Sequence, residues 1–473
     1  MIVRQELSDL ARELSLGLHV VEKDYVLGWL LAGISAHAAL AGNWVFKGGT
    51  CLKKCYFETY RFSEDLDFTV VEEAQLSEDF LLNAFRAISE WIYEASGIEI
   101  PVDQIRFNVI DIPGGKYAEG RVYYVGPIQQ RSSLARIKFD LTSKEKLVLA
   151  PVEREVHHPY SDRPEAGIHI LSYCFEEVFA EKVRALAERE RPRDLYDVVH
   201  LYRHDEIHPD RTVVMNTLRE KCAFKDIPVP TKDSLLRPDA KSKLLAEWEA
   251  MLRHQLPVLP PFEQFWGELP QVFDWLYEVA DKPAFTGMQI REEIDESWRP
   301  PAMVQAWHAA VPLESIRFAA ANRLCVNLHY QNTWRLIEPY SLRRSKEGHL
   351  LLYAVKHESG EPRSYRVDRI QGVEASTTPF VPRYLIELTP AGPLHAPATT
   401  RRLVSTARPI AAQPRRARKA ARHGSDGPTY IFKCTVCGKS FRRKSYDAAL
   451  NPHKNKQGYS CYGSFATYVR TEY

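Results

Sequence analysis

The segment FKGGTCLKKCYFETYRFSEDLDF, residues 46–68, constrains the fold of this chain more than any other. It predicts a glycine turn, a short helix and then a strand that carries Asp65 and Asp67. Because residues two apart in a strand point to the same face, both carboxylates project together, while Leu66 and Phe68 point into a core. The segment therefore predicts an acidic site on a strand whose other face is buried.

Two parallel carboxylates facing a glycine turn suit Mg²⁺ with a triphosphate attached. Gly48 and Gly49 allow the backbone to approach phosphate oxygens closely, and Thr50 can begin a helix whose N-terminus favours anions. Lys53 and Ser63 are further candidates for nucleotide binding. A glycine turn, a spacer and an Asp-x-Asp pair resemble the arrangement of nucleotidyltransferases. The alternative is a surface hairpin with solvated acids.

A second predicted strand, RIKFDLT at residues 136–142, alternates polar and apolar residues. Arg136, Lys138 and Asp140 share one face, and apolar residues occupy the other. On a neighbouring strand, Asp140 would add a third carboxylate to the Asp-x-Asp pair and complete a two-metal site for Mg²⁺. Two metals can activate an attacking hydroxyl and neutralise a leaving pyrophosphate.

Residues 175–202 predict two helices that are separated at Pro192. Lys182 in the first helix is a candidate phosphate ligand. Arg193 and Asp194, at the start of the second helix, are candidates to orient Lys182 or to bind the nucleotide. The alternative is a pattern of salt bridges on helix surfaces.

Five segments occur in the order found in the AbiEii/AbiGii-type nucleotidyltransferase toxins, and the resemblance covers roughly residues 1–280. The segments are 21–31, 46–54, 61–68, 136–142 and 180–199. The resemblance implies a polymerase-β-like core followed by a helical region. It also implies transfer of nucleotides from an NTP, tRNA 3′ ends as acceptors for some members, and a silencing antitoxin.

The resemblance also assigns residues by motif. It implies a nucleotide and metal site at Gly48, Gly49, Asp65 and Asp67, and further functional positions at Lys182 and Asp194. A separate family motif matches Glu22, Lys23 and Asp24. For that trio, Lys23 as a phosphate ligand and helix capping with ion pairing both remain open.

Composition bounds the rest of the chain. Its 473 residues predict about three domains, and a hydrophobic content of 45% is ordinary for a globular protein. No apolar run reaches the ~20 residues that a membrane-spanning helix needs. The N-terminus has early acids and no apolar signal region, so we expect a cytoplasmic protein without a membrane partner.

Residues 389–424 contain no acid but many basic residues, interleaved with Pro, Ala and Thr: Arg401, Arg402, Arg408, Arg415, Arg416, Arg418, Lys419 and Arg422. Such a segment cannot bury enough apolar surface to fold alone, so it predicts a disordered linker. Either it binds nucleic-acid phosphates, RNA before DNA, or it is a solvated tether.

The C-terminal segment predicts a small metal-stapled module. Cys434 and Cys437 form a Cys-x-x-Cys knuckle, and His453 and Cys461 complete a set suited to tetrahedral Zn²⁺. A fold of roughly 45 residues usually needs such a staple. The alternatives are a redox Cys-x-x-Cys or a chance spacing.

The same module is rich in basic and aromatic residues. Phe432, Phe441, Tyr459 and Tyr462 could stack on bases, although the two phenylalanines are better explained as a small core.

Residues 313–388 predict short alternating strands, with turns at Gly348 and Gly360, and hence a small β-barrel. The segment resembles the WYL domain at Tyr330, Arg335, Glu338, Pro339, Tyr340, Arg366, Asp368, Arg369 and Ile370. The tryptophan that names this family is replaced by a leucine. The three arginines either form a basic pocket or pair with Glu338 and Asp368.

Together these features predict an α+β multidomain protein. The expected parts are a catalytic domain at 1–230, a helical extension at 231–310, a WYL-like barrel at 311–390, a basic linker at 391–427 and a zinc finger at 428–473. The expected function is Mg²⁺-dependent transfer from an NTP to RNA, with tRNA favoured, in toxin–antitoxin or phage defence. The alternatives are a nucleic-acid-binding regulator and an enzyme that modifies protein hydroxyls.

Overall fold

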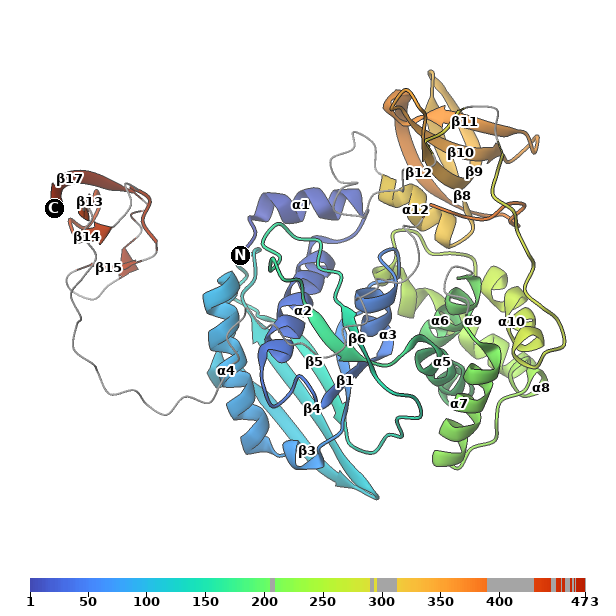
Figure 1. Ribbon diagram of the computed structural model, residues 1–473, viewed down its shortest axis with the longest axis horizontal. Coiled ribbons are helices and arrows are strands. Elements are labelled where there is room, and N and C mark those ends of the chain that lie inside the picture. Colours follow the sequence, from blue (N-terminus) through green and yellow to red (C-terminus); the bar gives the residue numbers. More distant parts are fainter. Residues whose placement is uncertain are drawn as a thin grey trace. The chain divides into compact units, whose positions relative to one another are not determined.

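The computed structural model describes residues 1–204, 209–289, 293–295, 313–388, 429–443, 448–451, 453–455, 460–461, 463 and 465–472. The chain divides into two compact units, Met1–Ala411 and Ala412–Tyr473 (Figure 1). The basic linker predicted at 389–424 lies outside the described residues. Among the described helices, none is both long and apolar enough to cross a membrane.

A seven-stranded mixed sheet forms the centre of the first unit. Its strands are β1 (Trp44–Lys47), β2 (Asp65–Val70), β3 (Arg106–Ile112), β4 (Gly115–Tyr124), β5 (Ala135–Thr142), β6 (Val152–Glu155) and β7 (His169–Ser172). Their spatial order is β3-β4-β5-β2-β1-β7-β6. β2 runs parallel to β5 and β1 runs parallel to β7, whereas all other neighbours are antiparallel. Both predicted acidic strands therefore lie at the middle of the sheet.

The two acidic strands have the predicted alternation. Leu66 and Phe68 on β2 are fully buried, as are Ile137 and Phe139 on β5. The carboxylates on the intervening positions are only partly covered. The burial of one face explains why the register is fixed, because a slip by one residue would move every apolar side chain into water.

Four helices accompany the sheet: α1 (Arg4–Glu13), α2 (Leu18–Ala36), α3 (Gly48–Cys51) and α4 (Glu78–Ser96). The α4 helix begins at the side chain of Ser77, which accepts the Phe80 N–H, and ends at Gly97 in the left-handed conformation. Its Phe85 ring lies 4.9 Å from the ring of Phe139 on β5. The α2 helix has apolar residues around most of its circumference, apart from its charged Glu22–Lys23–Asp24 segment near the start, and is largely buried.

A wide helical turn at Leu52–Tyr56 continues α3. Short 3₁₀ turns lie at Glu73–Gln75, Val102–Gln104, Arg253–Gln255 and Val367–Arg369.

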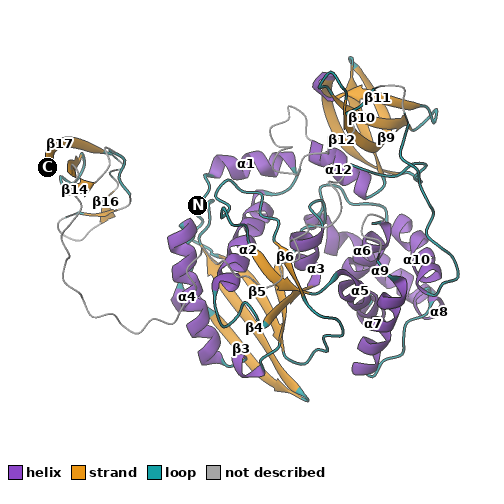
Figure 2. Cartoon of the chain, viewed as in Figure 1, coloured by secondary structure: helices purple, strands orange, loops and turns teal. Residues whose placement is uncertain are grey.

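A helical region follows the sheet (Figure 2). Its helices are α5 (Phe175–Arg189), α6 (Pro192–Arg203), α7 (Arg211–Phe224), α8 (Lys232–Leu235), α9 (Pro238–Leu252) and α10 (Phe262–Leu276). Pro192 begins α6, as predicted, because proline is well tolerated in a first helical turn. The Trp275 ring stacks on Phe179 with centroids 5.7 Å apart, so α10 packs against α5.

A five-stranded barrel and one helix complete the first unit. They are α12 (Leu313–Ala321), β8 (Leu324–Tyr330), β9 (Thr333–Arg344), β10 (Leu350–Lys356), β11 (Pro362–Arg366) and β12 (Ile370–Pro379). The strand order is β11-β10-β9-β8-β12. Gly348 and Gly360 both have positive φ in the turns that join the central strands, as the sequence predicted.

Hydrogen bonds join the barrel to the helical region. The Tyr196 hydroxyl on α6 donates to the side-chain oxygen of Asn322, 2.9 Å away and directly after α12. Glu268 on α10 accepts from Arg203 at 2.7 Å and from Arg323 at 2.9 Å. The helix that leads into the barrel is therefore held by the helix that carries Asp194.

The second unit contains β13 (Thr429–Cys434), β14 (Ser440–Arg443), β15 (His453–Lys454), β16 (Ser460–Cys461) and β17 (Ala466–Glu472). Its main sheet has the order β14-β13-β17. Among its described residues, the core cluster consists of Phe432, Cys434, Leu450 and Ala466. A core of this size offers little hydrophobic stabilisation by itself.

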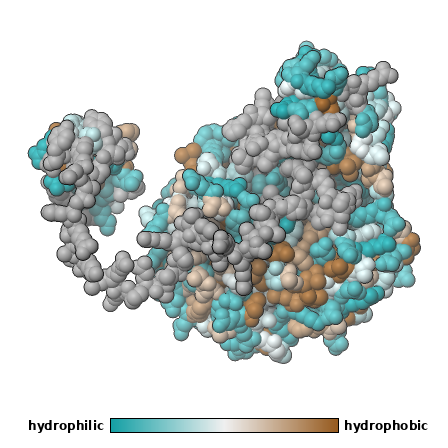
Figure 3. All heavy atoms as spheres, viewed as in Figure 1, coloured by the Kyte–Doolittle hydropathy of each residue, from teal (hydrophilic) through white to brown (hydrophobic). Residues whose placement is uncertain are grey.

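Most of the surface in view is hydrophilic, and apolar residues gather there in smaller patches (Figure 3).

Candidate active site and metal centre

The glycine turn lies directly against the acidic strand. Gly48 has φ +81°, and a Cβ atom at this position would lie 2.2 Å from Oδ2 of Asp67. A Cβ on Gly49 would lie 2.4 Å from a guanidinium nitrogen of Arg61 and 3.2 Å from the hydroxyl of Ser63. Both positions therefore need glycine because a carboxylate and a guanidinium occupy the space that a side chain would fill.

Thr50 fixes the turn to the strand. Its hydroxyl donates to the main-chain oxygen of Asp65 at 2.5 Å, and its side chain is fully buried. The hydroxyl thus has a partner within the protein, and Thr50 positions the carboxylate strand.

The three predicted carboxylates lie on two adjacent parallel strands. Asp67 on β2 is in register with Asp140 on β5, and Asp65 is in register with Lys138. Burial raises the pKa of Asp67 to about 6, and the charges of Asp140 and Asp65 add to this rise while Lys47 opposes it. Burial also raises the pKa of Asp65. The site therefore concentrates negative charge that its own cations only partly offset.

Both oxygens of Asp140 accept hydrogen bonds. The Tyr117 hydroxyl donates to one oxygen at 2.5 Å, and the Lys138 ammonium donates to the other at 3.0 Å. Burial, together with the bond to Asp140, raises the pKa of Tyr117 above its ordinary value, so Tyr117 remains a donor. An incoming cation at Asp140 would have to displace Lys138, whose side chain is 39% exposed.

An open cavity of about 620 Å³ adjoins these strands. Its lining residues are Lys47, Asp67, Ile112, Tyr117, Asp140, Thr142, Lys144, Glu145, Phe224, Lys225 and Asp226. The cavity therefore joins two of the predicted carboxylates to three lysines and to apolar side chains. A volume of this size falls within the range of small-molecule sites.

The sequence analysis missed several residues of this cavity. Lys47 pairs with Glu145, and burial lowers the pKa of Lys47 to about 8. Lys144 comes from the loop after β5, and Lys225 follows the last residue of α7. The lysine directly before Gly48 was the one available signal, because it ends the strand that leads into the turn.

Lys182 and Asp194 belong to a buried ion-pair cluster beside the site. The Lys182 ammonium lies 2.8 Å from Asp197 and 3.4 Å from Asp194. Arg61 binds Asp197 through two nitrogens, each at 2.7 Å, and Arg189 binds Asp194 at 2.7 and 2.9 Å. Although burial opposes it, the charges of Arg61 and Lys182 hold the pKa of Asp197 well below its usual range.

Two further predicted ligands, Arg193 and Lys53, differ in how they lie relative to the acidic strand and its cavity. Burial and the neighbouring Arg61 lower the pKa of Arg193, and Asp65 opposes the shift, which places Arg193 within electrostatic reach of Asp65. Lys53, in contrast, is buried and donates to the main-chain oxygen of Glu58. Lys53 does not line the carboxylate cavity.

The structure gives the Glu22–Lys23–Asp24 motif a role. Glu22 accepts the Ile128 N–H at 2.6 Å, and Asp24 forms a buried ion pair with Lys54 at 2.7 Å. Lys23 pairs with Glu64 at 2.6 Å, and its charge opposes the rise in the pKa of Asp65. Glu22 and Asp24 thus attach α2 to neighbouring segments, and the charge of Lys23 acts on the acidic strand.

The second unit brings the four predicted metal ligands together. The sulfur atoms of Cys434, Cys437 and Cys461 and a ring nitrogen of His453 all lie within 4.8 Å of one another. Among the described residues, only these gather three or more Cys, His, Asp or Glu ligand atoms so closely. Three sulfurs and one imidazole nitrogen at such spacing suit a tetrahedral ion such as Zn²⁺.

Two of the three barrel arginines bond to groups within the barrel itself. Arg366 binds Asp368 through two nitrogens, at 3.0 and 2.6 Å, as one of the two interpretations predicted. Arg335 instead binds the main-chain oxygen of Tyr330. Glu338 pairs with His357 at 2.9 Å, so the expected pairing of Glu338 with the predicted arginines is not among these contacts.

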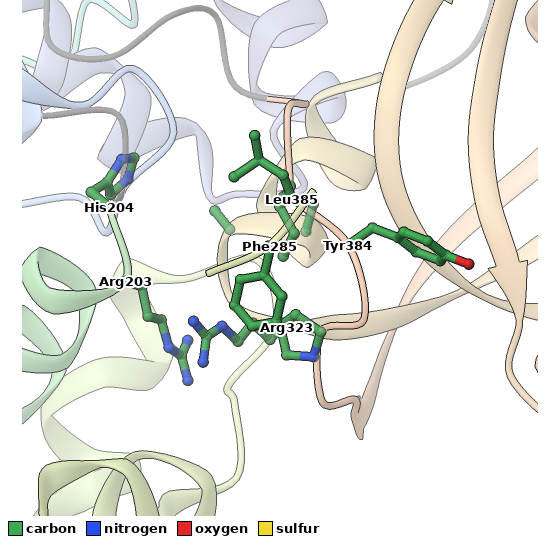
Figure 4. Close-up of a pocket in the computed structure, with 10 residues that line it drawn as sticks. Arg203, His204, Phe285, Arg323, Tyr384 and Leu385 are labelled. Atoms are coloured by element: carbon green, nitrogen blue, oxygen red, sulfur yellow. The ribbon is translucent and has the colours of Figure 1, made fainter. Parts of the chain in front are cut away.

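A separate small pocket lies where the barrel meets the helical region (Figure 4). Arg203 and Arg323 extend toward one another there, and Phe285 lies beside them. Its volume is only about 50 Å³, room for very few water molecules. It is distinct from the carboxylate cavity, because the two share no lining residue.

The glycine turn, the carboxylate strands and the cavity define a nucleotidyltransferase. A family model described as nucleotidyl transferase AbiEii toxin, type IV TA system, matches residues 29–279, more than half of the chain. The chain belongs to this family of toxins. A WYL domain model matches residues 312–375, so both resemblances seen in the sequence are confirmed.

Solved structures show a more distant similarity. JHP933 from Helicobacter pylori is 16% identical, with a TM-score of 0.37, over 56% of this chain and 94% of that one. MenT4, a nucleotidyltransferase toxin from Mycobacterium tuberculosis H37Rv, is 21% identical, with a TM-score of 0.34, over 59% of this chain and 99% of that one. No curated protein matches the chain.

Proposed function

We propose that this nucleotidyltransferase transfers a nucleotide from an NTP to an RNA acceptor, with tRNA favoured, in a Mg²⁺-dependent reaction. The observation that carries the proposal is the register of Asp67 with Asp140 on the wall of a lysine-containing cavity. A bacterial toxin–antitoxin or phage-defence setting, with a protein antitoxin, follows from the family.

The carboxylates fit a hard cation. Asp65, Asp67 and Asp140 offer oxygen ligands. Burial raises the pKa of Asp67, and the charges of Asp140 and Asp65 add to this rise, so a bound cation would relieve their mutual repulsion. Because their oxygens are not gathered around one point, we assign them as neighbouring pairs, Asp65 with Asp67 and Asp67 with Asp140. Bound Mg²⁺ would supply charge neutralisation for the triphosphate and a lower pKa for the acceptor hydroxyl.

The chain's own residues would hold the nucleotide. We assign phosphate contacts to Lys47, Lys144 and Lys225, because all three line the cavity that contains Asp67 and Asp140. The turn at Gly48 and Gly49 packs directly against Asp67 and Arg61, and Ser63 lies beside Gly49, so the turn would bring its main chain close to a nucleotide held at Asp67. Accumulated positive charge at transferring phosphoryl groups is the main catalytic resource of such sites.

The acceptor hydroxyl needs a base. We assign this role to Asp140, which accepts hydrogen bonds from Tyr117 and Lys138 and lies on the cavity wall. Movement of the half-exposed Lys138 would open one oxygen of Asp140 to the acceptor proton.

The buried cluster has a supporting role in this proposal. Lys182, Asp194 and Asp197 connect α5 to α6, and Arg61 connects both helices to the segment before β2. The cluster thus fixes Arg193 and the acidic strand relative to each other.

We propose that the Cys/His set binds a structural Zn²⁺ that holds the second unit together, with Cys434, Cys437, His453 and Cys461 as ligands. The domain boundaries at residues 230, 310, 390 and 427 also stay a prediction.

Labelling tests the proposal. Purified protein is incubated with total bacterial RNA, Mg²⁺ and each α-labelled NTP in turn, beside an Asp65→Ala/Asp67→Ala variant. We expect label in a discrete small-RNA band that is absent in the variant. Label that resists ribonuclease but not protease would establish a protein acceptor instead. No label with any NTP would favour the nucleic-acid-binding regulator, and DNA binding would then be measured.

A further inference from the structure

The small three-stranded sheet of the second unit has two distinct faces. Paired residues of antiparallel strands share a face, and residues two apart in a regular strand do as well. The pairing of β13 with β17 shifts register between Ile431 and Phe432, so Tyr468 and Arg470, although two apart, lie on opposite faces. Phe432 pairs with Phe441 and Tyr468, and Cys434 pairs with Ala466. These residues therefore lie on the face that carries the core and the metal ligand Cys434.

The opposite face is basic. Ile431 at the centre pairs with Arg442 on β14 and with Arg470 on β17. Lys433, two residues farther along β13, pairs with Ser440 and Thr467. All of these side chains except Ile431 are exposed. We call Lys433, Arg442 and Arg470 the cationic face.

The spacing of the cationic face suits a phosphate backbone. Neighbouring strands lie ~4.8 Å apart, so Arg442 and Arg470 are separated by about 10 Å across Ile431. Lys433 lies about 7 Å along β13, at ~3.4 Å per residue. Three cations at such separations can each contact a different phosphate of a nucleic-acid strand.

The charge of the whole segment agrees with this geometry. Residues 429–473 contain eight Lys or Arg but only two Asp or Glu, namely Asp447 and Glu472. The aromatic residues of the described sheet, including Tyr430 and Tyr468, lie on the other face. Phe432 is fully buried and cannot stack on a base. Tyr459 and Tyr462 lie outside the described residues.

We propose that the cationic face binds the sugar-phosphate backbone of RNA through its charges. Three Lys or Arg contacts would make this binding strongly salt-dependent, because each contact releases condensed counterions. The choice of RNA rests on the proposed function, whereas the existence of a phosphate-binding face does not.

The test is a binding titration with the full chain and no NTP. Affinity for tRNA, and for duplex DNA of equal length, is measured across a series of KCl concentrations. The test variant is Lys433→Gln/Arg442→Gln/Arg470→Gln. The control is Lys146→Gln/Lys241→Gln/Lys346→Gln, which removes three exposed charges from the first unit. Metal content is measured for both, because the metal ligands should be unaffected.

We expect the test variant to bind tRNA at least about tenfold more weakly at low salt, with a slope of log Kd against log [KCl] smaller by about 2–3. The control should bind like the wild type. Unchanged tRNA binding by the test variant, or an equal loss in the control, would overturn the proposal. A larger loss for DNA than for tRNA would overturn RNA as the partner. Because NTP is absent, a failure of nucleotidyl transfer cannot produce any of these results.

Discussion

Asp67 and Asp140 lie side by side on two adjacent parallel strands, at the same register position. More than seventy residues separate them in the sequence. They come together because β2 and β5 are neighbours in the sheet. The proposed roles of this pair and of the residues around it can be tested by substitution.

Asp67→Asn should lower nucleotidyl transfer by about a hundredfold or more, because it removes a charge from the proposed cation site. Its melting temperature should stay level or rise, since the buried carboxylate lies among like charges. Label transfer and thermal unfolding measure the two effects. Asp111→Asn, whose side chain is 89% exposed on β3, is the matched control and should change neither. Full activity in Asp67→Asn would remove Asp67 from the site.

Gly48→Ala should abolish most activity, because the new methyl group would displace the Asp67 carboxylate. Gly114→Ala is an apt control: Gly114 also has φ +81°, but its nearest neighbour to an added Cβ is the side chain of Lys144 at 3.7 Å. Both variants should lose about 1 kcal/mol of stability from backbone strain. Steady-state kinetics together with chemical denaturation separate the two effects. Equal activity of the two variants would show that only backbone strain matters.

Divalent-ion affinity should depend on pH through Asp67. Its pKa is about 6, so below that value a bound ion must displace a proton, and affinity should fall about tenfold per pH unit. The folded-state pKa lies above the usual ~3.9, so the metal-free protein should lose stability as pH rises between these values. Calorimetric titration with Mn²⁺ at several pH values tests the first statement. In Asp67→Asn the affinity should become weak and nearly independent of pH over this interval.

Asp197→Asn should destabilise the first unit by about 3–5 kcal/mol, because it leaves the buried charges of Arg61 and Lys182 without their partner. The pKa of Asp197 is depressed, so its contribution is present above the unfolded value and is lost as pH falls through the folded one. Urea denaturation near neutral pH measures the effect. Glu220→Gln breaks the exposed pair with Lys146 and should cost under about 1 kcal/mol.

Removal of metal should unfold the second unit alone. Its core cluster, as far as the structure describes it, is small, whereas the first unit has an extensive core of its own. We expect a strong chelator, or Cys437→Ser, to abolish amide protection in residues 429–472 while residues 1–204 keep theirs. Hydrogen exchange read by mass spectrometry reports both regions. Cys222→Ser, at a buried cysteine far from the metal set in sequence, should leave the second unit protected.

The acidic strands could be predicted because alternation is a local property. Leu66 and Phe68 fixed which face of β2 is buried, and the same pattern in residues 136–142 fixed β5. Lys53 illustrates the opposite case. It lies in the wide turn after α3, where the helical spacing changes, and its side chain enters the interior instead of the cavity.

The cavity lysines could not be predicted, because they come together only in the folded chain. Lys144 lies in the loop after β5, and Lys225 directly follows α7, about eighty residues later. Asp197 was not among the candidate residues, yet it is the most densely paired acid of the buried cluster. Its role depends on its bond to Arg61, which lies 136 residues earlier in the sequence, just before β2.

The bond between Tyr196 and Asn322 bears on how proteins of this kind can be recombined. A gene fusion that kept the catalytic half and replaced the barrel would leave a buried phenol without its acceptor and uncover the apolar side of α12. Exchange of modules should therefore succeed only when the cut falls after the barrel. We therefore expect the catalytic half and the barrel to be exchangeable only as one piece, whereas the metal-bearing segment belongs to a separate compact unit and can be exchanged by itself.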